Sequence, residues 1–89
     1  MDINYKAITA IYTLGVGDQV VDCTSGTFTV TLPTAVGITG KAFTLKNSGA
    51  GSITLDGDGS ETIDGVTTKV LAANDSVTVL SDNVNWILI

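Results

Sequence analysis

The sequence predicts an all-β fold: a compact antiparallel β-sandwich, barrel or β-prism of about eight short strands. Apolar and polar side chains alternate strictly in several segments, as they do in a strand with one buried face. The composition agrees, because 14 threonines and 10 glycines suit exposed strand faces and tight turns rather than helices. Short apolar segments also recur at regular intervals with turn residues between them, which is typical of such folds.

The first expected strand spans residues 3–14 and is apolar on both of its faces. One face holds Ile8, Ala10, Tyr12 and Leu14, and the other holds Ile3, Tyr5, Ala7 and Ile11. A strand of this kind needs cover from two directions. We therefore expect residues 1–16 to be either a plain first strand or an arm that docks on a neighbouring subunit or a larger particle. Residues 17–89 are expected to form a single β-domain.

The clearest alternation lies in the segment TFTVTLP. Phe28, Val30 and Leu32 share one face, and threonines share the other. Pro33 ends the strand, because proline has no backbone N–H to donate. Counting this one, further strands are expected at residues 19–24, 27–32, 41–47, 52–56, 61–63, 67–72, 75–81 and 84–89.

Two segments leave alternatives open. Residues 34–39 form the longest connection, which could be one turn of helix or a loop whose Val36 and Ile38 pack on the core. The last strand is again apolar on both faces, with Trp86 and Leu88 on one side and Ile87 and Ile89 on the other. It is expected to be either a central strand within one monomer or part of a subunit interface.

Length and charge restrict the possible partners. A single domain of 89 residues has a thin core, while 44% of its residues are hydrophobic, so we expect the surplus apolar surface to contact other protein chains. No apolar run is long enough for a membrane span. The net charge of −5, with four lysines and no arginine, makes nucleic acid an improbable ligand.

The chain offers little catalytic chemistry, and we expect no enzymatic activity, cofactor or metal. It has no histidine, and its one cysteine, Cys23, is expected to be a small buried hydrophobic residue. Asp56 and Asp58 have the spacing that begins an EF-hand loop, but Glu61 stands where that loop needs glycine and Thr67 where it needs glutamate. The acidic segment is therefore expected to form solvated turns.

Candidate contact residues come from the two segments that are apolar on both faces. Phe28 and Phe43 are expected in the core, which leaves the tyrosines and the terminal strand for contacts. The predicted interface residues are Ile3, Tyr5, Ile8, Ile11, Tyr12, Trp86, Ile87 and Ile89.

Four segments occur in an order and spacing that resemble a β-module of bacteriophage virion proteins. They read VTLPTA (30–35), GKAFTLKN (40–47), ETIDG (61–65) and LSDNVNWILI (80–89). The module's pattern, TLP-A, GK-F-IKN, TIDG and SDG-NW, is associated with tail-fibre and tail-spike segments and small head proteins. The resemblance covers residues 18–89. Asn83 stands where the pattern has glycine, which is tolerable because asparagine also accepts left-handed backbone geometry.

The resemblance implies a compact β-domain, a homo-oligomer and often a trimer, on the outside of a virus particle. We expect a virion protein made in the host cytoplasm, which decorates or cements the capsid surface or forms a head fibre. Its partners would be other copies of itself and the major capsid protein or other virion proteins. We expect the module to stand alone, without the shaft or chaperone segments of a long fibre, which favours this role. The alternative is a tail-fibre receptor-binding module that recognises host surface glycans.

Overall fold

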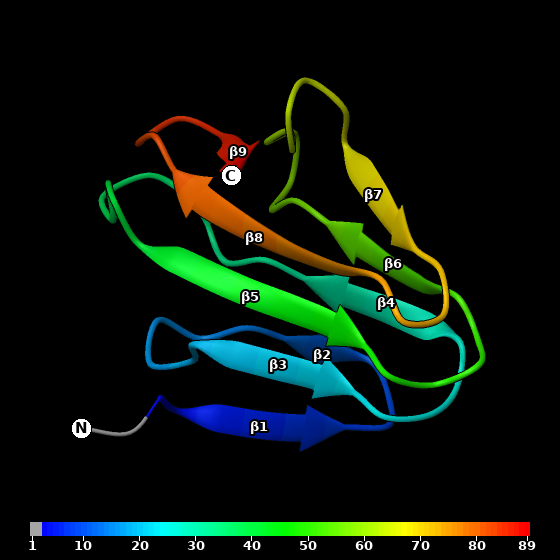
Figure 1. The fold of residues 1–89 in the computed structure, drawn as a ribbon. Helices are drawn as coiled ribbons and strands as arrows, with labels where there is room; N and C mark the ends of the chain where they lie inside the picture. The colour runs from blue at the N-terminus through cyan, green and yellow to red at the C-terminus, as the bar shows by residue number, and fades with distance from the viewer. Residues whose placement is uncertain (1–2) are drawn as a thin grey trace.

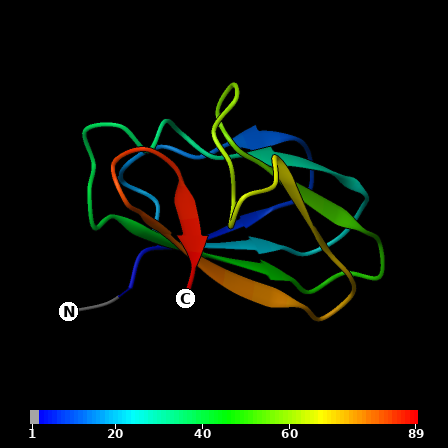
Figure 2. The same cartoon turned by 90° about the horizontal axis from the view of Figure 1, so that it is seen from above.

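The computed structural model describes residues 3–89 and confirms the all-β prediction, since these residues form nine strands and no helix (Figure 1). The strands are β1 (Tyr5–Ile8), β2 (Tyr12–Thr13), β3 (Val20–Cys23), β4 (Phe28–Thr31), β5 (Ala42–Asn47), β6 (Ile53–Asp56), β7 (Thr68–Leu71), β8 (Ser76–Ser81) and β9 (Trp86–Leu88). They form two mixed sheets that lie one over the other (Figure 2). The order is β1-β3-β5-β8-β9 in the five-stranded sheet and β2-β4-β6-β7 in the four-stranded sheet.

From β1 to β6 the chain changes sheet at every step. Neighbouring strands of one sheet therefore run parallel: β1 with β3, β3 with β5, β2 with β4, and β4 with β6. Strands β7, β8 and β9 then pair antiparallel with β6, β5 and β8. The molecule thus begins as a short two-sided solenoid of three turns and ends as an antiparallel addition.

The expectation of an antiparallel fold is wrong for the first six strands. Parallel partners need a long crossover connection, which short turns cannot supply. Here the crossover between two partners is the strand of the opposite sheet, as β4 is between β3 and β5. Alternating hydrophobicity is the same for a half-buried strand of either direction, so the sequence pattern could not distinguish them.

The strand positions match the sequence-based expectation with two exceptions. Residues 3–14 form two strands, because the chain bends at Thr9 and Ala10 and passes to the other sheet. Residues 61–63 form no strand; Ile63 makes only isolated bridges, to Val66 and to Trp86.

The connection at residues 34–39 is a loop rather than a helical turn. Ile38 packs against the core from this loop, as expected, whereas Val36 is 58% exposed. The buried residue of the loop is instead Ala35.

One apolar core fills the space between the two sheets. The alternation in β4 points Val30 into it, Leu32 follows on the same side, and Phe28 packs at its margin. The rings of Phe43 and Trp86 meet with their centroids 5.5 Å apart. The buried members are Ile8, Leu14, Val21, Cys23, Val30, Leu32, Ala35, Phe43, Leu45, Ile53, Leu55, Ile63, Leu71, Val79 and Trp86.

A buried asparagine fastens the end of β5. The Asn47 amide nitrogen donates to the carbonyl oxygens of Gly51 (2.8 Å) and Leu71 (2.9 Å), and its amide oxygen accepts from the Gly49 N–H (3.1 Å). A fully buried amide would otherwise be costly, so this side chain fixes the β5–β6 connection and ties it to β7.

The turns of successive solenoid layers also stack on one another. A Cβ atom at Gly51 would overlap the Gly26 carbonyl oxygen and the Thr27 hydroxyl, and one at Gly49 would lie 2.9 Å from the Cα atom of Ser25. Parallel strands are about 4.8 Å apart, and the turns that join them must keep the same spacing. Glycine is required here because two backbones touch.

We predict that Gly51→Ala lowers the free energy of unfolding by about 1–3 kcal/mol, because the added methyl group must push two stacked turns apart. Gly17→Ala is the matched control, since a Cβ atom there has no neighbour within 4 Å. It should change stability by no more than about 0.5 kcal/mol. Urea unfolding followed by tryptophan fluorescence measures both. Equal stability of the two variants would contradict the stacked-turn arrangement.

Candidate interaction surface

The outer face of the five-stranded sheet is the broadest regular surface of the molecule. We define the outer face as the side chains of this sheet that point away from the core. The strand register arranges them in three rows across the strands: Ala42, Leu80 and Ile87; Tyr5, Val20, Thr44 and Thr78; and Ala7, Asp22, Lys46 and Ser76. Such a flat, regular arrangement follows from the period of two in every strand.

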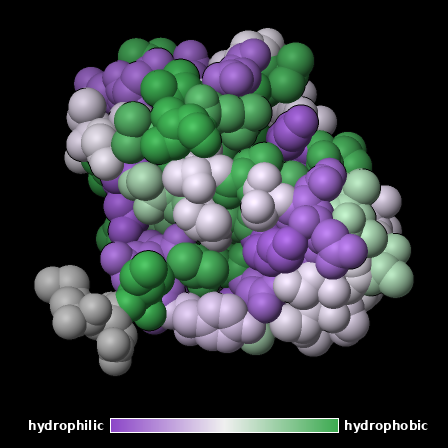
Figure 3. Space-filling view, viewed as in Figure 1, coloured by the Kyte–Doolittle hydropathy of each residue, from purple (hydrophilic) through white to green (hydrophobic). Residues whose placement is uncertain are grey.

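One end of the outer face is apolar. Ala42, Leu80 and Ile87 lie side by side across β5, β8 and β9, and all three are only partly buried. Ile89 follows β9 and adds to this apolar area. Its N–H donates to the Thr78 carbonyl oxygen (3.0 Å), and Ile89 is 71% exposed. Hydrophobic side chains accordingly gather over β8 and β9 in Figure 3.

The middle row of the outer face carries no charge. The Thr44 and Thr78 hydroxyl oxygens lie 3.0 Å apart and share a hydrogen bond, which uses part of their polar capacity within the face. Val20 lies next to Thr44, and Tyr5, which is 59% exposed, continues the row at the edge of the sheet.

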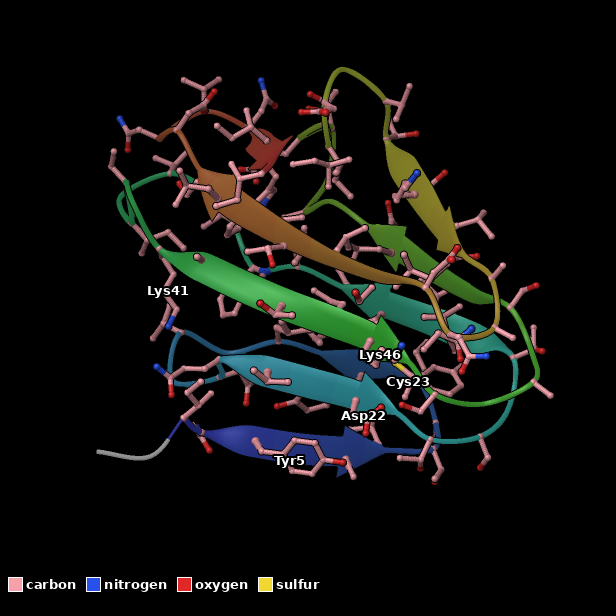
Figure 4. All side chains as sticks on the ribbon, viewed as in Figure 1. Tyr5, Asp22, Cys23, Lys41 and Lys46 are labelled. Atoms are coloured by element: carbon pink, nitrogen blue, oxygen red, sulfur yellow. The ribbon has the colours of Figure 1, made fainter. Side chains whose placement is uncertain are left out.

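The third row contains the only two ionisable side chains of the outer face other than Tyr5. Asp22 accepts hydrogen bonds from the Tyr5 hydroxyl (2.6 Å) and the Ser48 hydroxyl (2.5 Å). The Lys46 ammonium donates to the Asn74 carbonyl oxygen (2.6 Å). Figure 4 shows Asp22 and Lys46 near the ends of β3 and β5, with the Tyr5 side chain lying along β1 below them. Both charges are therefore held by groups of the protein itself.

The hydrogen bonds to Asp22 change the pKa values of Asp22 and of Tyr5, its neighbour from the middle row. The bond from Ser48, and then that from Tyr5, lowers the pKa of Asp22 below its ordinary value of 3.8, and the positive charge of Lys46 acts in the same direction. The bond that Tyr5 donates to Asp22 raises the pKa of the Tyr5 phenol, since ionisation of the phenol would lose it. The ionised carboxylate and the neutral phenol are thus the stable pair over a wide pH range.

A second exposed apolar group lies along the first layer of the solenoid. Ile3 is 68% exposed and Ile11 is 74% exposed. The Tyr12 ring is half-buried beneath the Lys6 ammonium, which lies 5.3 Å from the ring centroid, and its hydroxyl donates to Asp18 (2.6 Å). Lys6 places a charge at this open edge, a common device against unwanted strand pairing.

The predicted contact residues therefore separate into two groups. Ile3, Tyr5, Ile11 and Ile89 are exposed, and Tyr12 and Ile87 are partly exposed. Ile8 and Trp86 are 8% and 0% exposed and belong to the core, so their side chains offer no surface to a partner. Alternation accounts for this, because Trp86 and Leu88 point inward while Ile87 and Ile89 point outward.

Sequence reasoning missed Val20 in the middle row of the outer face and Leu80 in its apolar end row. A signal was present: in β8 the inward residues Val77 and Val79 alternate with Thr78 and Leu80, so the face opposite the core also contains a large apolar residue. Only the register of β8 beside β9 reveals that Leu80 is adjacent to Ile87.

Three loops meet at one corner of the molecule. The Glu61 carboxylate accepts from the Thr34 hydroxyl (2.5 Å) and the Ala35 N–H (2.8 Å). The Asn83 amide oxygen accepts from the Gly37 N–H (2.9 Å). These side chains therefore have structural roles in joining the loops.

Residues 3–89 offer no site for a small molecule or a metal ion. This part of the chain contains no pocket and no group of side chains able to hold a metal ion. Nor does this part of the chain contain a helix long and apolar enough to cross a membrane. Comparisons with protein-family models, curated proteins and solved structures give no significant match.

We predict that Asp22→Asn brings the pKa of the Tyr5 phenol down toward its ordinary value of 10.0. The Tyr12 phenol, whose pKa is raised first by its hydrogen bond to Asp18, should be unaffected. Absorbance titration of the wild type, of Asp22→Asn and of the control Asp18→Asn separates the two tyrosines. An unchanged titration in Asp22→Asn would mean that the Tyr5 hydrogen bond does not form in solution.

The pKa of Asp22 also sets a pH dependence of stability. Since folding lowers this pKa, ionised Asp22 stabilises the fold at pH values above 3.8, and the contribution is lost as the pH falls through the lower folded value. Unfolding at several pH values should therefore show a smaller acid-induced loss of stability in Asp22→Asn than in the wild type. Identical losses would contradict this assignment.

Proposed function

We propose that this chain is a structural protein of a bacteriophage particle, which decorates or cements the capsid surface or forms a head fibre through protein–protein contacts. The observation that carries the proposal is the outer face of the five-stranded sheet. It is flat, largely uncharged and apolar at one end. The resemblance of residues 18–89 to the phage virion module supplies the biological setting.

The physical properties of the outer face suit contact with another protein surface. Removing a charge from water is expensive unless it keeps its partners. Here Asp22 and Lys46 keep theirs when the face is covered, because Ser48, Tyr5 and Asn74 belong to the same chain. The remaining side chains are apolar or hydroxyl-bearing, and their burial is favourable or nearly neutral.

The rest of the surface supports a role as an assembly component. Among residues 3–89, nine large hydrophobic side chains are exposed, and those that lie together can supply apolar area for protein contacts. The nine are Ile3, Tyr5, Ile11, Val16, Val36, Val66, Val70, Val84 and Ile89. In the proposed assembly, other copies of this chain and the major capsid protein or other virion proteins cover part of this area.

Immunogold labelling of phage particles from the source tests this proposal. We expect a gold-conjugated antibody against this chain to label the head. Particles from which the gene has been deleted are the control and should carry no label. Unlabelled wild-type particles would contradict the proposal. Label on the tail would also contradict it and favour a receptor-binding module for host glycans, which titration with host polysaccharide would then examine.

A further inference from the structure

We propose that a second copy of this chain binds on the outer face of the five-stranded sheet. This inference rests on the proposed function in one respect, since it names the surface by which copies of that structural protein meet. It is otherwise argued from the charges, side chains and dimensions of the two sheets.

Charge favours this face for contact between identical copies. Each copy carries a net charge of −5, so two copies repel one another over most of their surfaces. The outer face holds one carboxylate, Asp22, and one ammonium group, Lys46. Its own net charge is zero, and the whole excess of negative charge lies elsewhere. Two outer faces can therefore approach without the repulsion that other surfaces would meet.

The opposite side of the molecule differs from the outer face in its charge and in the kind of side chain that it exposes. The outward side chains of the four-stranded sheet lie in two further rows across the strands. They are Thr13, Thr29, Thr31, Thr54, Asp56, Thr68 and Val70. This surface is dominated by hydroxyl groups and carries an acid without a lysine beside it. Two such surfaces would lose bound water and bring like charges together, whereas two five-stranded faces would bury Leu80, Val20 and Ile87.

The size of the outer face fits a reversible contact. The five strands have three to six residues each, so at about 3.3 Å per residue and 4.8 Å between strands the flat area is roughly 350–400 Å². A standard interface buries about 800 Å² of accessible surface on each partner. The side chains and the exposed Ile89 at the rim add to the flat area, but the contact is smaller than a standard interface. We therefore expect association to depend on concentration.

Two pairs of matched variants test the surface. Thr78→Lys and Leu80→Lys each add a charge to the outer face. Thr54→Lys and Val70→Lys add the same charge to the opposite sheet at outward positions of the same kind. Thr78 and Thr54 are both partly buried threonines, and their replacement leaves the core untouched, so these two variants remain informative if Leu80→Lys fails to fold. Circular dichroism verifies the fold of each.

Sedimentation equilibrium over a range of concentrations provides the measurement. The wild type, Thr54→Lys and Val70→Lys should rise from the monomer mass of 9.1 kDa toward a dimer. Thr78→Lys and Leu80→Lys should weaken association by about tenfold or more, because a lysine must be buried in the contact. A wild type that stays monomeric would overturn the inference. So would equal effects at both sheets, or loss of association in Thr54→Lys alone.

The outcome can be distinguished from failure of the proposed function. Sedimentation of the purified protein requires no phage particle, whereas immunogold labelling does not depend on the state of association. Self-association through the outer face without label on particles would leave this inference intact and remove the virion role. A labelled head together with a protein that stays monomeric in solution would support the virion role and overturn this inference.

Discussion

The parallel stacking of three solenoid layers is the constraint on which the structure depends. It places apolar residues of successive layers beside one another: Val21 lies next to Leu45 in one sheet, and Val30 next to Leu55 in the other. A slip of one residue in either sheet would turn these side chains to water and bring threonines inward. The turns reinforce the register, because the backbone at Gly51 touches the turn of the preceding layer. Core, register and outer surfaces are therefore determined together.

The two outer surfaces follow from the same alternation but have different chemical character. In the five-stranded sheet the positions opposite the core hold apolar residues, hydroxyl-bearing residues and one balanced pair of charges. In the four-stranded sheet they hold mainly threonines and Asp56. A protein with one cohesive side and one hydrated side is suited to a place at the boundary of an assembly, where one surface is covered and the other meets water. The proposed capsid-surface role matches this division.

Sequence reasoning predicted the strands best where the alternation is strict, as in residues 27–32 and 75–81, because a half-buried strand has a period of two in any sheet. Sequence reasoning failed where one hydrophobic pattern is compatible with more than one structure. Residues 3–14 have apolar side chains on both faces, and nothing in the pattern marks the bend that sends the second half to the other sheet. The predicted antiparallel pairing is also wrong for the first six strands, because the crossover that permits parallel strands is itself a strand.

The candidate surface was predicted only in part for a related reason. Exposed residues near the ends of the chain, such as Tyr5 and Ile89, could be found from segments with two apolar faces. Val20 and Leu80 could not, because they are brought into one surface only by pairing between strands distant in sequence. Trp86 is as apolar as its neighbours in the sequence, and only the inward direction of β9 assigns it to the core.

The most direct test of a cohesive outer face is the exposure of individual methyl groups to a dissolved paramagnetic probe, measured by NMR at low and high protein concentration. The account predicts that the methyl groups of Val20, Leu80 and Ile87 become shielded as the concentration rises, while those of Val70 on the opposite sheet stay exposed. Equal exposure of Val20 and Leu80 at both concentrations would contradict it.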